Sequence, residues 1–236
     1  MRESDDEKRQ RAARIEAALD ELREDGATLS PLTPPAGKQL ASTFWGRAWC
    51  RHLAEFEVYE KRLLPGRTLL RKQQVLDLAI APGGNTAWVV DDAVHRVRVG
   101  IQPMDSELWQ EVVTACAGAV PSLLDLLSGQ LGESVLATLT DPENGILPQP
   151  GDIRTVCGCD DYADPCRHAA AVLYGAGLKL DESPTLLFTL RGRDAAELLG
   201  SARDTAIADL NASSTELQGA DLSQLFGIEL DSDEAR

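Results

Sequence analysis

The chain has 236 residues, 43% of them hydrophobic, and carries 38 acidic against 23 basic side chains, for a formal net charge of −15. This length and apolar content allow one large domain or two small ones with a substantial core. The acidic excess argues against a protein that coats nucleic acid non-specifically, because such proteins displace counterions with Lys and Arg.

The N-terminal region predicts a charged helix and then a linker. Its first residues, Met1 to Asp6, lack the apolar core of a signal peptide, and no apolar run approaches a membrane span, so we expect a cytoplasmic protein without membrane contact. Residues 5–25 carry a narrow apolar stripe of Ile15, Leu19 and Leu22, which suits docking on a partner or on the main body. A frayed, solvated helix is the alternative. The proline-rich residues 30–35 predict a linker.

An aromatic and basic segment follows. Residues 41–64 have helical spacing, Pro65-Gly66 predicts a turn, and residues 68–70 predict a short strand. Residues 37–104 hold ten basic and six acidic side chains, the one local basic surplus in the chain. These cations either lie on the solvent-exposed face of a helix whose other face packs on the core, or form a surface that binds nucleic acid. The candidate contacts are Arg47, Arg51, Arg67, Arg71, Lys72, Arg96 and Arg98.

The next residues predict an antiparallel meander. Strands are expected at 75–80, 87–90 and 94–101, with a hairpin turn at 82–85. Alternation in the last strand places Arg96 and Arg98 on one face, away from Val97 and Val99. His95 stands alone in this strand, and we interpret it as structural and not as a ligand.

The chain then becomes helical. Asp105 or Ser106 can cap a helix that runs to Cys116, and shorter helices are expected at 121–127 and 134–139. Cys50 and Cys116 lack ligand spacing to a partner and are interpreted as packing residues. After loops at 142–145 and 148–151, residues 153–156 predict a strand that ends at Cys157.

The most informative stretch is Cys157-Gly158-Cys159, six residues, and then Cys166-Arg167-His168. Zn²⁺ takes four sulfur or nitrogen ligands in a tetrahedron, and this pattern supplies four within twelve residues. We expect a helix to begin near Cys166, which would favour its thiolate. A disulfide set, buried inert thiols and a Cys-His nucleophile are the alternatives, and the polar spacer and the extra cysteines favour metal.

This stretch resembles the SWIM-type zinc finger, whose signature is C-x-C, a spacer and C-x-H. The resemblance assigns Cys157, Cys159, Cys166 and His168 as zinc ligands, and flanking blocks extend the likeness to about residues 40–205. The Asp160-Asp161-Tyr162 segment departs from the Pro-Asp and Trp of many members of the family. The resemblance implies DNA binding or protein contact, in company with Swi/Snf-type helicase-like ATPases, transposases and recombination-accessory proteins.

Beyond the finger, Gly175 and Gly177 are expected to loosen the C-terminus of its helix, and further helices are expected at 181–187 and from Asp194. The acidic residues 211–236 predict a flexible tail with a short apolar motif. We divide the chain into segments 1–36, 37–104, 105–152, 153–178, 179–210 and 211–236.

The expected fold class is α+β, a small antiparallel β-meander followed by helices, with an embedded zinc finger built from a strand or hairpin and a helix. No catalytic motif or small-molecule substrate site emerges from the sequence. We therefore expect a non-enzymatic Zn²⁺ module that binds a protein partner, DNA or both, as an accessory subunit of a helicase-like ATPase. A zinc hydrolase or nuclease with an open metal site, and a purely structural scaffold, are the alternatives.

Overall fold

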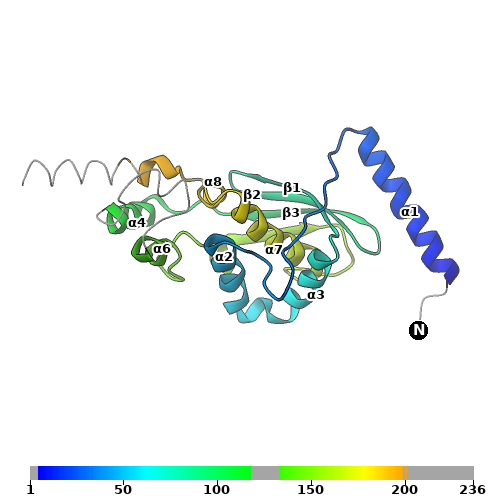
Figure 1. Ribbon diagram of the computed structural model, residues 1–236, viewed down its shortest axis with the longest axis horizontal. Helices are drawn as coiled ribbons and strands as arrows, with labels where there is room; N and C mark the ends of the chain where they lie inside the picture. The colour runs from blue at the N-terminus through cyan, green and yellow to red at the C-terminus, as the bar shows by residue number, and fades with distance from the viewer. Residues whose placement is uncertain (1–4, 118–132, 199, 201–236) are drawn as a thin grey trace, which may run out of the picture.

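The computed structural model describes residues 5–117, 133–198 and 200. Its centre is a four-stranded antiparallel sheet in the order β1-β2-β3-β4, formed by Val75–Ala81, Gly84–Val90, Val94–Ile101 and Ile153–Cys157. The α+β prediction and its meander are confirmed, and the finger's strand completes the sheet by pairing with β3 (Figure 1).

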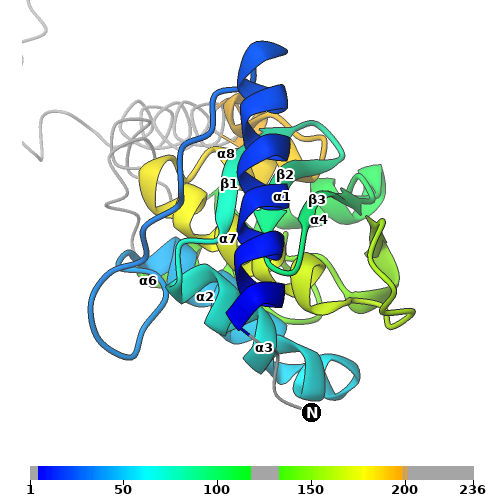
Figure 2. The same ribbon diagram turned by 90° about the vertical axis from the view of Figure 1, so that its right-hand side faces the viewer.

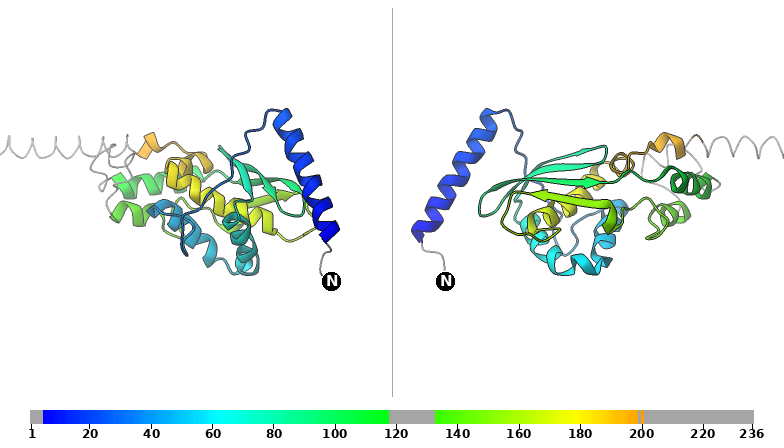
Figure 3. Two further views of the ribbon diagram at one scale, coloured as in Figure 1. Left: turned by 45° about the vertical axis from the view of Figure 1, so that its right-hand side comes forward. Right: turned by 180° about the vertical axis from the view of Figure 1, so that it is seen from behind.

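Helix α7 (Arg167–Glu182) lies against the sheet and is the core element of the fold. Every residue from His168 to Leu178 is buried, and a helix that is covered on all sides must have packed neighbours all round. The sheet covers one side of it, and α2 (Phe44–Glu55) and α3 (Glu60–Arg71) cover the other (Figures 1 and 3). The three layers therefore place the start of α7 beside the end of β4.

Two sequence predictions fail in the aromatic segment, at the Pro65-Gly66 turn and at the strand 68–70. A short 3-10 turn, Glu57–Tyr59, separates α2 from α3, and α3 continues through Pro65 to Arg71. The reason is the contact with α7: a Cβ on Gly66 would lie 2.6 Å from the Cβ of Ala170, so a glycine is needed where the two helices meet. Tertiary packing overrides the local turn signal.

The predicted loosening of the finger helix at Gly175 and Gly177 is also wrong, because α7 runs on to Glu182. Gly177 meets α2 at close range, where an added Cβ would lie 2.9 Å from Cys50 Sγ. The helix expected at 181–187 accordingly begins later, as α8 (Leu186–Leu190). Residues 195–198 are helical, as expected after Asp194.

The N-terminal helix α1 (Asp5–Glu24) is confirmed and stands at one end of the sheet (Figure 2). Its apolar stripe, Ile15, Leu19 and Leu22, is half-buried. The segment predicted as a linker is partly ordered by the sheet, since Leu32 N–H donates to the Val75 carbonyl at 2.9 Å and Pro31 bridges Leu76.

Helices α4 (Ser106–Ala117) and α6 (Glu133–Leu139) pack together beyond the sheet and confirm two further predictions. Asp105 caps α4 by accepting from the backbone N–H groups of Glu107 and Leu108. The helix expected at 121–127 and the tail 211–236 lie outside the described residues. No helix in the described ranges has the length and apolar character needed to cross a bilayer.

Candidate metal centre

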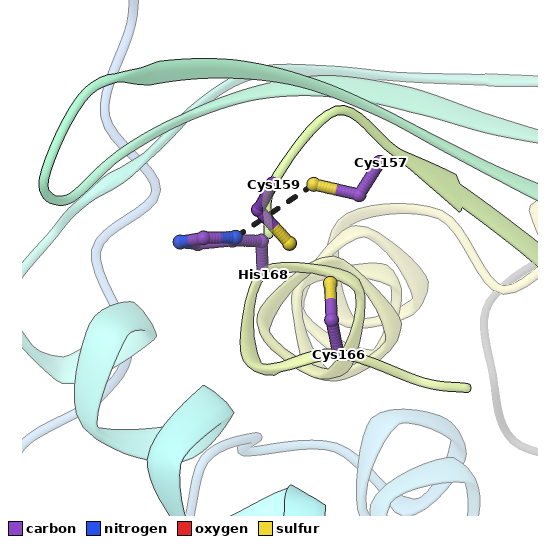
Figure 4. Close-up of side chains that lie close together, drawn as sticks. All are labelled: Cys157, Cys159, Cys166 and His168. Atoms are coloured by element: carbon purple, nitrogen blue, oxygen red, sulfur yellow. Dashed lines mark hydrogen bonds between the residues drawn. The ribbon is translucent and has the colours of Figure 1, made fainter. Parts of the chain in front are cut away.

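The four predicted ligands converge at the junction of β4 and α7. Their candidate ligand atoms, three Sγ atoms and one imidazole nitrogen, all lie within 4.8 Å of one another. Figure 4 shows the four side chains gathered at one place, with a dashed line between the sulfur of Cys157 and the nearer ring nitrogen of His168. In a zinc tetrahedron with Zn–S bonds of about 2.3 Å, neighbouring sulfurs are about 3.8 Å apart, so the cluster fits one metal ion of this kind.

Local structure explains why these side chains meet. Cys157 is the last residue of β4, opposite Val97 of β3, and Cys166 is the N-cap of α7, with its Sγ 3.4 Å from Ala169 N. His168 therefore falls in the first turn of the helix, where its side chain is 1% exposed. One ligand pair comes from a strand end and the other from a helix start.

The spacer between the ligand pairs is fastened from both sides. Thr155 Oγ1 donates to Asp164 Oδ1 at 2.6 Å, and Asp161 forms an ion pair with Arg62 of α3 at 3.2 Å. Asp161 also accepts from Ala163 N–H at 3.1 Å, which closes the loop on itself. Asp161 and Asp164 thus shape the turn between the two ligand pairs.

The two nitrogens of His168 have different neighbours. Nδ1 lies 3.7 Å from Cys157 Sγ, whereas Nε2 lies 3.3 Å from Asp91 Oδ2 at the end of the β2–β3 hairpin. When a metal takes Nδ1, Nε2 carries the hydrogen and donates it to Asp91. Such a carboxylate fixes the tautomer and the orientation of a histidine ligand. Arg167 Nε holds Asp91 in place at 2.8 Å.

A second histidine supports the first. The ring of His95 stacks on that of His168 with centroids 4.2 Å apart, and its Nε2 lies 2.9 Å from Asp92 Oδ1. From the sequence, His95 was interpreted as structural and Asp91-Asp92 as a turn between strands, without a connection to the finger. His95 shares the inner strand face with buried Val97, and that alternation was the available signal that it points toward the finger.

Burial dominates the electrostatics of the cluster. It raises the pKa of Cys157 to about 12, with the neighbouring cysteines as a further cause, and it raises the pKa of Cys166. The backbone N–H groups at the start of α7 favour the Cys166 thiolate, as expected, but burial outweighs them. Burial, and then His95, lowers the pKa of His168, which keeps the imidazole neutral and able to coordinate. A metal cation is what these thiols need in order to ionise.

The other two cysteines lie away from the cluster. Cys116 is fully buried in α4, and Cys50 is half-buried where α2 meets α7. Burial raises the pKa of Cys50 to about 12 and that of Cys116 to about 11. Both positions agree with the packing role expected from the sequence.

The seven candidate nucleic-acid contacts do not share one surface. Arg47, Arg51 and Arg67 line one cleft, whereas Arg96 and Arg98 lie exposed on the outer face of the sheet, as their alternation predicted. Arg71 donates to the carbonyls of Pro35 and Gln39 and so holds the preceding loop. Lys72 is the exposed C-cap of α3. The basic side chains of residues 37–104, which are neighbours in the sequence, are thus separated in the structure.

A Cys₃His cluster between a strand end and a helix start defines a zinc-finger class of metal site. Residues 141–175 match the family model of the SWIM zinc finger, and they contain all four ligands. The chain therefore carries a SWIM-type finger, as its motif predicted. Asp91 and His95 come from outside the matched residues.

One similar protein extends the comparison beyond the finger. The chain is 31% identical over 167 residues to Uncharacterized protein Rv2102 of Mycobacterium tuberculosis, covering 69% of this chain and 59% of that protein. The chain thus spans less than two thirds of the relative's length. No solved structure matches the chain.

Proposed function

We propose that this chain is a non-enzymatic binding module of the cytoplasm, built around one structural Zn²⁺ ion. The observation that carries the proposal is the convergence of three thiols and one imidazole nitrogen within 4.8 Å. A reducing compartment keeps such thiols available to metal. Cys157, Cys159, Cys166 and His168 would hold the ion, and the ion would supply a cross-link between β4 and α7.

Four protein ligands complete the tetrahedron of a structural zinc site. A zinc hydrolase or nuclease needs an open position where water can bind and ionise. The support that Asp91 gives to His168 holds the fourth ligand in place and so favours the closed form. The enzyme alternative requires that one of the four ligands leave the metal.

The module is proposed to work by contact with a protein partner, with DNA or with both. The finger fixes a loop whose Tyr162 is 100% exposed, and Val156 of β4 is 66% exposed nearby in the chain. Tyrosines are common energetic centres of protein interfaces. By the SWIM resemblance, the proposed partner is a helicase-like ATPase of the Swi/Snf type, to which this chain would be an accessory subunit.

Cobalt substitution tests the closed site. The Co²⁺ form of the full chain is expected to show the visible absorption of a tetrahedral sulfur-rich site, unchanged when azide is added. A spectrum that shifts with azide would show an exchangeable position and would support the hydrolase alternative instead.

Affinity purification from the native cell tests the partner. A helicase-like ATPase should be recovered with the wild-type chain and depleted with Tyr162→Ala, which leaves every metal ligand in place. If the ATPase is absent from the wild-type sample, or is recovered equally with Tyr162→Ala, the proposed contact is refuted.

A further inference from the structure

An open cleft of about 540 Å³ lies between α2, α3 and the loop that precedes α2, away from the metal ligands. Four cationic residues line it, namely Lys38, Arg47, Arg51 and Arg67. Among the described residues, no acidic side chain lines this cleft. In a chain with 38 acidic and 23 basic side chains, such a cluster runs against the overall balance and indicates an anionic ligand.

The positions of these cations suit the binding of an anion. Arg47 and Arg51 are four residues apart on α2, so their side chains leave the same helix face one turn apart. Both are exposed, and within the described ranges no carboxylate forms an ion pair with either. Arg67 donates to the backbone carbonyl of Lys38, which ties α3 to the rim of the cleft. Two guanidinium groups are thus free to bind a phosphate, and a third is fixed beside them.

The remaining lining is apolar or neutral. Phe44, Leu40 and Ala48 form the apolar part, and Cys50 and Tyr174 provide a thiol and a phenol. Burial raises the pKa of both groups, so they carry no negative charge at neutral pH. The Asp181 carboxylate, which contributes to the raised pKa of Cys50, accepts hydrogen bonds from Thr43 at the start of α2. The cleft therefore combines cations with an aromatic ring and apolar surface.

We propose that this cleft binds a nucleotide, with its phosphate on Arg47, Arg51 and Arg67 and its base against Phe44. The volume lies within the ~300–1,000 Å³ typical of small-ligand sites. Base–aromatic stacking combined with cationic phosphate contacts is the chemistry by which proteins hold single nucleotides. The ligand is either a free nucleotide or one nucleotide of a single strand. A free nucleotide would go beyond the proposed function, whereas a single strand would rest on its DNA contact and locate that contact in this cleft. Neither ligand requires the ATPase partner.

The test uses the full zinc-loaded chain and two probes. Adenosine monophosphate is titrated by calorimetry, and a short fluorescein-labelled single-stranded deoxyoligonucleotide by polarisation at several salt concentrations. We expect saturable binding of at least one probe, weakened about tenfold or more in an Arg47→Ala/Arg51→Ala variant, because two charged contacts are lost. Binding of the mononucleotide identifies a free nucleotide, and binding of the strand alone identifies nucleic acid.

The matched control is Arg96→Ala/Arg98→Ala, which removes two exposed arginines from the outer sheet face. It should bind both probes as the wild-type chain does. The inference is overturned if neither probe binds saturably, or if the Arg47/Arg51 variant binds as tightly as wild type. Either failure leaves the zinc content and the cobalt spectrum unchanged, so it is distinct from a failure of the proposed function.

Discussion

The clearest test of the metal centre's design is the replacement of Asp91, which binds no metal in the proposed site. Asp91→Ala removes the acceptor 3.3 Å from His168 Nε2 and leaves the Arg167 guanidinium without its 2.8 Å partner. The ring of His168 then loses the group that fixes its tautomer. Zinc affinity is expected to fall.

The size of the loss follows from the geometry. Loss of a carboxylate that supports a histidine ligand costs about 10- to 100-fold in metal affinity, which is about 1.4–2.7 kcal/mol. Arg167 Nε lies only 3.4 Å from His168 Nε2, and without Asp91 its guanidinium keeps only the longer ion pair with Asp92, at 3.5 Å, so its positive charge beside the ligand is less well balanced. We therefore expect Asp91→Ala to fall in the upper half of that range. Asp91→Asn keeps an oxygen acceptor and should lose about tenfold or less.

Competition with a chromophoric zinc chelator at fixed pH measures the affinities. Asp92→Asn is the control, because the asparagine oxygen can still accept from His95 Nε2, and the Asp92 side chain is 57% exposed and lies 3.9 Å from His168 Nε2. Its affinity should stay within about threefold of wild type, as expected for a screened surface charge. Equal zinc affinity for Asp91→Ala and wild type would show that the carboxylate does not orient the ligand.

Three further outcomes are expected. Gly66→Ala should lower the free energy of unfolding in urea by about 1–3 kcal/mol, because the new Cβ would lie 2.6 Å from Ala170 Cβ. Gly158→Ala is the control, because a Cβ at Gly158 would have no atom within 4 Å. A Gly66→Ala chain that is more stable than wild type would refute the close contact. Zinc binding near neutral pH should release about three protons, because burial raises the pKa of Cys157 and keeps His168 neutral. Calorimetry in buffers of different ionisation enthalpy measures this number, and a release of one proton or fewer would contradict the prediction. Cys157→Ser and His168→Ala should lose zinc and melt at lower temperature, and unchanged melting with retained zinc would speak against a structural metal.

The sheet and the ligand set could be predicted because their signals are local. Alternation from Val94 to Ile101 follows the two-residue repeat of a strand, and it correctly separated Arg96 and Arg98 from the buried valines. The C-x-C and C-x-H spacing named four residues that the fold brings within 4.8 Å. In both cases the information lies within a dozen residues of sequence.

The predictions that failed, and the residues that were missed, lie where segments distant in the sequence come into contact. Gly66, Gly175 and Gly177 looked like helix breakers, but they lie where α3, β1 or α2 approach α7 closely. Asp91 and His95 lie more than seventy residues before His168, and a pattern of spacing cannot connect them. The grouping of Arg47 and Arg51 with Arg67, and the separation of Arg96 and Arg98, likewise depend on the packing of α2 and α3.

Native mass spectrometry of the purified full chain shows directly whether the finger is built around one metal ion. We predict one zinc ion per chain, with thiol protons displaced, and its loss in Cys157→Ser. A chain that keeps its folded charge-state distribution without any bound metal, or that retains one zinc in Cys157→Ser, would contradict it.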